Sequence, residues 1–164
     1  MRTSSFDPEL PEELIQEDFA EFLRRCHQCG QCSSVCPSLR NGGIRPREVM
    51  ERAITGTFEL ETDRSIWLCT MCNGCSERCE MGVNPAGVIN ALRRLSAQRG
   101  GAPDHLLSEV KLFKETGLAF PRTRLTSKLR GELDLEELEV DADTQDELDL
   151  IVKRTSMGRL PVER

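Results

Sequence analysis

The residues that could do chemistry in this chain are eight cysteines, which fall into two runs. Both runs have the form C-x2-C-x2-C-x3-C, and each cysteine of the first run has a counterpart 43 residues later. The first run comprises Cys26, Cys29, Cys32 and Cys36, and the second comprises Cys69, Cys72, Cys75 and Cys79. The matched spacing indicates an internal duplication that carries the chemistry of the protein.

This spacing is typical of iron–sulfur ligation. Three thiolates spaced three residues apart can fold around one corner of a cubane, each binding a different iron, while the fourth is directed away. In two-cluster ferredoxins of this spacing the fourth cysteine ligates the other cluster. The first run resembles that pattern, including Pro37, whereas the second has Glu80 where proline is expected. The resemblance implies two 4Fe–4S clusters with crossed ligands: Cys26, Cys29, Cys32 and Cys79 for the first, and Cys69, Cys72, Cys75 and Cys36 for the second.

Two other uses of eight cysteines are open to a chain of this kind. Two structural zinc sites are one alternative, although zinc usually takes two close pairs from separated knuckles. A disulfide framework is the other, and it is disfavoured because nothing resembling a secretory signal opens the chain. Iron and sulfur remain the first interpretation.

No catalytic residue is predicted. The sequence has no phosphate loop, no flavin or nicotinamide fingerprint and no nucleophile–base pair. His27 lies between two cysteines and His105 near a helix start, and both are expected to face solvent. With all eight cysteines used as ligands, none is free to attack a disulfide. The pattern therefore predicts a chain that conducts electrons.

Length and composition favour one compact domain with extended ends. The chain has 164 residues, of which 30% are charged, and it contains no tyrosine. The core should be small for this length, which suits a domain that is stabilised by bound metal. No apolar run approaches the roughly 20 residues of a membrane helix. We therefore expect a soluble protein of the reducing cytoplasm.

The net charge of −6 is distributed unevenly. Residues 26–131 contain fifteen basic and ten acidic residues, whereas residues 132–149 contain ten acidic residues and no base. A basic surplus around the cysteines would offset the negative clusters and raise their potentials. Nucleic acid is not an expected partner, because the middle segment offers few aromatic side chains to stack bases.

Helices are expected between and around the runs, with no alternating β pattern. A helix that starts at Pro11 should carry an apolar stripe, through Phe19 and Phe22, as far as Leu23. Thr62 or Asp63 should cap a short helix that brings Trp67 beside the second run, where it would screen the second cluster from water. Further helices are expected from Pro46 to Gly56, after the Asn84–Pro85 cap to Gly100, and from Pro103 to Gly117.

The fold class expected is all-α, a helical two-cluster ferredoxin domain with helical extensions. The predicted parts are residues 1–17, an N-terminal extension; 18–117, the domain; and 118–164, a C-terminal tail. In the tail, a basic segment is followed by an acidic one, and Thr144 with Glu147 forms an expected capping box. Because this tail cannot bury much against itself, we expect it to dock on a partner.

Longer stretches resemble the small iron–sulfur subunit of heterodisulfide reductase, its C subunit. The resemblance is carried by Asp63-Arg64-Ser65-Ile66-Trp67-Leu68-Cys69-Thr70-Met71-Cys72 and by Thr116-Gly117-Leu118-Ala119-Phe120-Pro121, and it covers about residues 18–130. It implies an electron-transfer subunit of a cytoplasmic complex, which relays electrons from the flavin-bearing A subunit to the disulfide-reducing B subunit. The implied substrate is the heterodisulfide of coenzyme M and coenzyme B, used in methanogenesis, and a hydrogenase or formate dehydrogenase can supply the electrons.

The cysteine motif also resembles iron–sulfur parts of other complexes. Similar motifs occur in glycolate oxidase, anaerobic glycerol-3-phosphate dehydrogenase and succinate dehydrogenase. The alternative within electron transfer is therefore an equivalent subunit of a sulfur-oxidising or organic-acid dehydrogenase complex. The alternative of another class is a structural zinc adaptor that moves no electrons.

Overall fold

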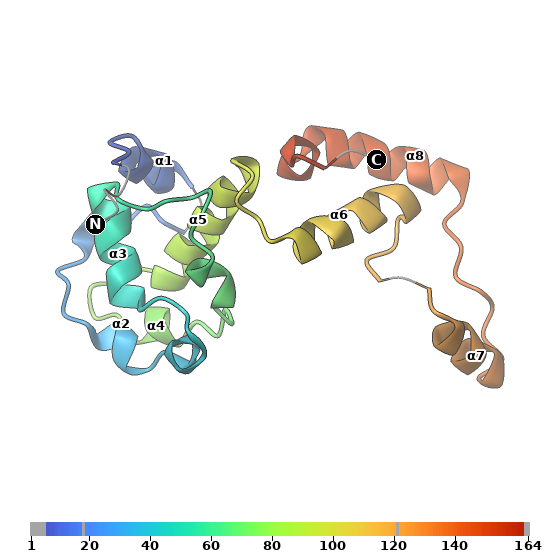
Figure 1. The fold of residues 1–164 in the computed structure, drawn as a ribbon, viewed down its shortest axis with the longest axis horizontal. Coiled ribbons are helices and arrows are strands. Elements are labelled where there is room, and N and C mark those ends of the chain that lie inside the picture. The colour runs from blue at the N-terminus through green and yellow to red at the C-terminus, as the bar shows by residue number, and fades with distance from the viewer. Residues whose placement is uncertain (1–5, 18, 121, 163–164) are drawn as a thin grey trace. The chain divides into compact units, whose positions relative to one another are not determined.

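The computed structural model describes residues 6–17, 19–120 and 122–162. Every regular element in these ranges is an α-helix or a 3₁₀-helix, and none is a strand. The predicted all-α fold is confirmed. Contacts divide the chain at the Ala102–Pro103 bond into two compact units, each of which is described by itself (Figure 1).

The first unit contains both cysteine runs. Its elements are α1 (Leu10–Gln16), η1 (Leu23–Arg25), α2 (Gln31–Ser34), η2 (Pro37–Asn41), α3 (Pro46–Thr55), η3 (Ser65–Leu68), α4 (Gly74–Glu77) and α5 (Pro85–Gln98). Helices α1, α3 and α5 pack against one another, and the short helices α2 and α4 lie side by side (Figure 1). One cysteine of each run lies in a short helix, Cys32 in α2 and Cys75 in α4, and the others lie in the turns beside these helices. The longer helices form the frame that carries both runs.

A single apolar core joins the three longer helices. It is formed by Leu10 and Leu14 of α1, by Val49, Met50 and Ala53 of α3, and by Val88, Ile89 and Leu92 of α5. These side chains recur at helical spacing, so each helix buries one face. Complete burial of such a side chain stabilises the fold by roughly 1.5–3 kcal/mol.

Most of the predicted helix boundaries are confirmed. Helix α3 begins at Pro46 and ends before Gly56, whose φ of 66° is the left-handed conformation that closes a helix. Asn84 caps α5, because its side chain accepts a hydrogen bond from the Gly87 amide at 2.9 Å.

The predicted helix from Pro11 to Leu23 is wrong beyond Gln16, although Leu23 at the end of the stripe is buried in the core as expected. Helix α1 ends at Gln16, Phe19 adopts a φ of 70°, and the Phe19 and Phe22 side chains are exposed. The cause is a close approach to α5, since a Cβ on Gly87 would lie 2.7 Å from the Phe19 Cβ. An ion pair of 2.9 Å between Glu17 and Arg94 joins the same turn to α5. Tertiary contact with α5 therefore overrides the helical periodicity.

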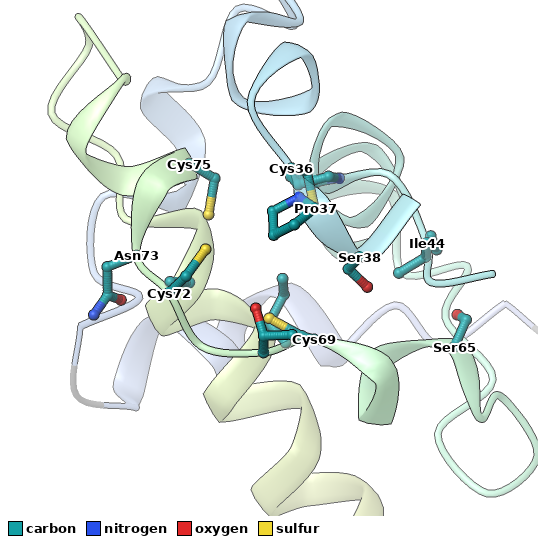
Figure 2. A pocket seen from close by; sticks show the side chains of 13 residues that line it. Cys36, Pro37, Ser38, Ile44, Ser65, Cys69, Cys72, Asn73 and Cys75 are labelled. Atoms are coloured by element: carbon teal, nitrogen blue, oxygen red, sulfur yellow. The ribbon is translucent and has the colours of Figure 1, made fainter. Parts of the chain in front are cut away.

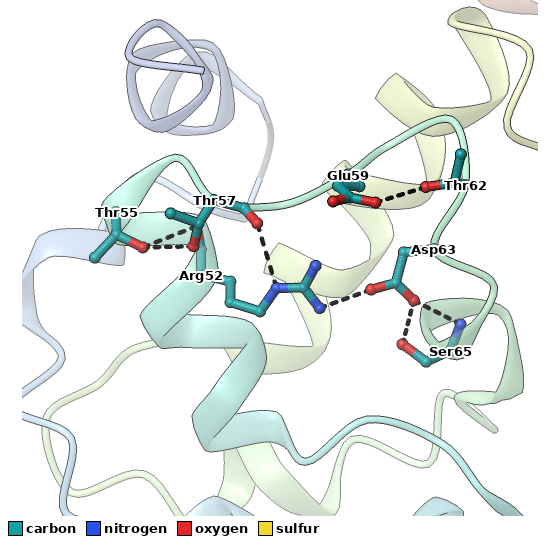
Figure 3. Close-up of polar contacts among 7 residues, drawn as sticks. All are labelled: Arg52, Thr55, Thr57, Glu59, Thr62, Asp63 and Ser65. Atoms are coloured by element: carbon teal, nitrogen blue, oxygen red, sulfur yellow. Dashed lines mark hydrogen bonds and ion pairs between the residues drawn. The ribbon is translucent and has the colours of Figure 1, made fainter. Parts of the chain in front are cut away.

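Asp63 connects α3 to the lead-in of the second cysteine run. Its carboxylate accepts hydrogen bonds from the Ser65 amide at 2.9 Å and from Arg52 at 2.7 Å (Figure 3). Burial favours a higher pKa for Asp63, but the hydrogen bonds from Ser65 and Arg52 outweigh it and lower the pKa. Thr62 and Asp63 are the two predicted caps of the short helix η3. The Asp63 carboxylate accepts from an amide in the first turn of η3, whereas the Thr62 hydroxyl donates to the Glu59 carboxylate.

One serine contact occurs in both halves of the duplication. The Ser33 hydroxyl accepts a hydrogen bond from the Arg47 amide at 3.0 Å, and the Ser76 hydroxyl accepts one from the Ala86 amide at 3.1 Å. Ser33 and Ser76 are 43 residues apart, and each amide is the second of the long helix that follows. Each serine therefore joins a short cysteine-bearing helix to the start of a long one.

The second unit has little core of its own. Its elements are α6 (Asp104–Thr116), α7 (Arg124–Glu132), α8 (Ala142–Arg154) and η4 (Ser156–Arg159). Helices α6 and α8 pack together, but no apolar side chain described in this unit is fully buried. Asp141, rather than Thr144, caps α8 by accepting from the Thr144 amide at 2.7 Å, so the predicted capping box is wrong.

Two further expectations concern the domain boundaries and a membrane-spanning helix. The division at residues 17/18 and 117/118 stays a prediction. Among the described residues, no helix combines the length and the apolar character that a membrane crossing requires.

The repeated serine contact leads to a matched pair of stability predictions. Ser33→Ala and Ser76→Ala should each lower the free energy of unfolding by about 1 kcal/mol, because a helix-start amide loses its acceptor. The measurement is the thermal unfolding midpoint of the cluster-loaded protein, followed anaerobically by circular dichroism. Ser34→Ala is the control, since the exposed Ser34 bonds only to Gln31 in its own turn. Equal unfolding midpoints for all three variants would contradict the predicted stabilisation by the repeated serine contact.

Candidate iron–sulfur centre

The eight cysteines gather around two cavities of the first unit. One cavity, of about 380 Å³ including space open to solvent, is lined by Cys26, Cys29, Cys32 and Cys79. The other, of about 420 Å³ on the same measure, is lined by Cys36, Cys69, Cys72 and Cys75 (Figure 2). The structure thus brings together the two sets of four that the spacing predicts, whereas the role of each cysteine as a ligand stays a prediction.

The backbone of the first run is repeated in the second. Gln28 and Met71 have φ values of 61° and 52°, and Gly30 and Asn73 have values of 84° and 59°. Each pair is separated by 43 residues. Asn73 is therefore the counterpart of Gly30, and asparagine is a residue that tolerates the left-handed conformation. The sequence analysis did not single out Asn73, although the 43-residue offset between the runs makes it the counterpart of Gly30.

Left-handed Gln28 and Met71 are unusual, since both carry long side chains. Such conformations cost of order 1–3 kcal/mol and persist where the surroundings over-determine them, often at functional sites. In the second run the turn brings the Met71 amide to 3.5 Å from the Cys69 sulfur. An N–H at this place stabilises a thiolate, which is what an iron ligand must be.

Ser38 explains how Cys36 reaches the cavity of the other run. Buried Ser38 donates a hydrogen bond to the Leu68 carbonyl at 2.9 Å, which joins the end of the first run to the residue before Cys69. Gly43 leaves room for this contact, because an added Cβ would lie 1.9 Å from the Ser38 hydroxyl oxygen. Sequence reasoning did not single out Ser38, and only its partner across 30 residues identifies it.

The thiols differ in how easily they lose a proton. Burial, and to a lesser degree the nearby thiols of Cys69, Cys32 and Cys36, raise the pKa of Cys75 to about 11. The amide of Gly74 lowers the pKa of exposed Cys72. A buried thiol such as Cys75 becomes a thiolate when a metal supplies the compensating positive charge, so cluster assembly and proton release are coupled.

Each cavity has one exposed cysteine. Cys29 is exposed at the first cavity and Cys72 at the second, and they are counterparts in the duplication. His27 is exposed at the first cavity, as expected. His105 is exposed in the first turn of α6, also as expected.

Trp67 contributes to the core instead of the cavity. It packs against the apolar cluster and is absent from the residues that line the second cavity. Its indole nitrogen is buried without a hydrogen-bond partner. Trp67 therefore does not screen the second cluster from within the wall of its cavity.

The residues present fit two 4Fe–4S clusters. Each cavity offers four thiols, and the second is walled by apolar Ile44, Ala86 and Ile89. No group of three or more histidine, cysteine or carboxylate side chains within the described ranges is arranged to hold one metal ion. Cubane ligands each bind a different iron, so they stand farther apart than thiolates on one zinc, whose Zn–S bonds are about 2.3 Å.

Comparison with known proteins agrees with this donor set. Residues 22–83 match the family described as a 4Fe-4S dicluster domain, and this match spans both cysteine runs. The protein therefore carries two 4Fe–4S clusters, and the zinc-adaptor alternative is not supported.

Three relatives similar to this chain come from Methanococcus maripaludis, Methanocaldococcus jannaschii and Methanosarcina mazei. The second C-type subunit of the "H(2)/formate:CoB-CoM heterodisulfide,ferredoxin reductase" of Methanococcus maripaludis is 38% identical, over 70% of this chain and 62% of the relative. The corresponding iron–sulfur subunit of CoB–CoM heterodisulfide reductase from Methanocaldococcus jannaschii is 32% identical, over 74% and 66%. The C subunit of the ferredoxin:CoB-CoM heterodisulfide reductase of Methanosarcina mazei is 33% identical, over 85% and 89%.

The extent of these matches differs between relatives. The chain spans slightly less than two thirds of the first two relatives and most of the third. In the third case, 33% identity extends over 85% of this chain and 89% of the relative. On this evidence of sequence and donor set, the chain belongs to the family of heterodisulfide reductase C subunits.

Proposed function

We propose that this chain is the electron-transfer subunit of a cytoplasmic heterodisulfide reductase complex. Electrons pass from a flavin-bearing subunit, through the two 4Fe–4S clusters of this chain, to a catalytic subunit that reduces the coenzyme M–coenzyme B heterodisulfide. The names of the relatives support the reaction, since they refer to CoB–CoM heterodisulfide reductases. The chain itself holds no substrate and serves as the connection between two catalytic partners.

The observation that carries the proposal is the exchange of fourth cysteines between the two halves. We assign Cys79 to the first cluster and Cys36 to the second, because each lines the cavity of the opposite run. When bound, the clusters supply one-electron transfer. The protein holds them with thiolates, excludes water with Ile44, Ala86 and Ile89 at the second cavity, and fixes their separation through the shared frame.

The exposed cysteines support a relay with two ends. Electrons enter at one cluster and leave at the other, so each cluster needs a place where it approaches a partner. Cys29 at the first cavity and Cys72 at the second are both exposed, and they belong to different runs. We propose that the flavin-bearing and the disulfide-reducing subunits dock at these two places.

The second unit supports a docking role for the C-terminal part of the chain. In α7, Leu125 and Leu129 are 65% and 48% exposed and lie four residues apart on one face. Exposed leucines on one helix face are typical of a surface that a partner covers. We propose that this helix docks on another member of the complex, and that an electron-donating hydrogenase or formate dehydrogenase joins the same assembly.

Ligand exchange is tested by comparing cysteine variants across the two runs. Cys36→Ala should reproduce the defect of Cys72→Ala, and Cys79→Ala that of Cys29→Ala, because each pair shares a cluster. The measurements are iron content, about eight per chain in the unaltered protein, and the EPR spectrum after reduction. If Cys36→Ala instead resembles Cys29→Ala, the ligands are not crossed.

The relay is tested by following cluster reoxidation. The reduced chain is mixed anaerobically with the disulfide-reducing subunit, and cluster absorbance should return rapidly only when the CoB–CoM heterodisulfide is also present. The disulfide-reducing subunit without the heterodisulfide, and the heterodisulfide without that subunit, are the controls. Reoxidation that needs no disulfide-reducing subunit, or that requires an organic-acid dehydrogenase instead, would contradict the proposed reaction.

Docking through α7 is tested without disturbing the clusters. Leu125→Gln with Leu129→Gln should weaken co-purification with the flavin-bearing and disulfide-reducing subunits at least tenfold while leaving the iron content unchanged. Glu132→Gln at the exposed end of the same helix is the control, because its ion pair with Lys128 is solvated and contributes little. Undiminished co-purification of the double variant would exclude this face as the docking surface.

A further inference from the structure

Arg93 of α5 stands out because its guanidinium is half-buried beside the start of the second cysteine run. Its Nε donates to the Ile66 carbonyl at 2.9 Å, and its Nη2 donates to the Cys69 carbonyl at 2.7 Å. The guanidinium carbon lies 5.5 Å from the centre of the Trp67 ring. Three contacts with residues 66–69 thus fix both the arginine and the backbone that presents Cys69.

The charge of Arg93 is not balanced by a carboxylate. Among the ion pairs of the described residues, Arg52, Arg94 and Arg99 have acidic partners, but Arg93 has none. A half-buried guanidinium without a counter-ion is costly, because burial removes water from the charge. A negative cluster held by Cys69 would supply the missing counter-charge.

The position of Arg93 along α5 agrees with this. Ile89 lines the second cavity, and Arg93 follows four residues later on the same face of the helix. Arg93 therefore lies one helical turn beyond the wall of the cavity. Arg94, the next residue, is directed to Glu17 of the N-terminal turn.

Within the described residues, the first half of the duplication has no equivalent charge at the matching position of its long helix. Pro46 and Pro85 each begin a long helix, and each is followed by the amide that the repeated serine binds. Counting eight residues from each proline pairs Arg93 with Ile54, which packs against the core. Arg47 lines the first cavity, but its side chain is exposed, so solvent screens its charge.

We infer that Arg93 is a positioning residue that also raises the reduction potential of the second cluster selectively. Reduction adds a negative charge to a cluster, and a nearby cation in a partly dry environment stabilises that charge. The two hydrogen bonds to carbonyls hold the guanidinium in place, so its effect does not depend on a mobile side chain. This inference rests on the proposed assignment of Cys69 to the second cluster.

Redox titrations monitored by EPR test this inference on the cluster-loaded chain. Arg93→Gln should lower the potential of the second cluster and leave that of the first unchanged. We expect about a tenfold change in the reduction equilibrium, which for one electron corresponds to about 59 mV. Arg93→Lys keeps the charge and loses the paired hydrogen bonds. The reduction equilibrium of its second cluster should therefore stay within about threefold of that in the unaltered protein. Arg94→Gln should move neither potential.

The outcomes separate this inference from the proposed function. Iron content and both EPR signals report whether the ligand sets are intact in each variant. If both clusters are present in Arg93→Gln and neither potential moves, or both move equally, the role of Arg93 is refuted and the relay is untouched. If Arg93→Gln does not fold, Arg93→Lys and Arg93→Met take its place. An unaltered potential of the second cluster in Arg93→Lys together with a shifted one in Arg93→Met supports the role of the Arg93 charge. Equal shifts in both variants refute that role.

Discussion

The first unit depends on the exchange of one cysteine between its two halves. Cys36 lies at the cavity of the second run and Cys79 at that of the first, so neither half completes its own set of four. A metal cluster that draws ligands from both halves converts binding energy into folding energy. On the proposed ligand assignment, the clusters would help a unit with a modest apolar core to keep its short helices of four residues in fixed positions.

The same contacts that hold the runs also organise the frame. Ser33 and Ser76 each bind the start of the following long helix, and Ser38 links the end of one run to the beginning of the other. Each hydrogen bond is modest in net terms, about 1 kcal/mol. Their importance lies in position. The bonds of Ser33 and Ser76 place the short cysteine-bearing helices relative to α3 and α5, and the bond of Ser38 places one cysteine run relative to the other.

Duplication gives two similar sites, and differences between them would give the proposed relay a direction. The halves share backbone geometry at Gln28 and Met71. Among the residues that the structure describes, the half-buried Arg93 without an acidic partner accompanies the second run and has no counterpart at the first. Exposure is shared as well, because Cys29 and Cys72 are both at the surface. Similar ligands with dissimilar surroundings are the means by which proteins separate the potentials of chemically identical clusters.

Sequence alone determined the cofactor type, the helical fold and most helix ends, because these follow from short-range spacing and local capping residues. The crossed grouping of the cysteines came from the resemblance of their spacing to that of two-cluster ferredoxins. Tertiary structure decided the rest. The N-terminal helix stops at Gln16 because the chain at Phe19 meets Gly87, a contact between residues far apart in sequence. Asn73 was readable in principle from the 43-residue offset. The places of Ser38 and Arg93 were not, because their partners are carbonyls, which every residue has and which no sequence pattern distinguishes.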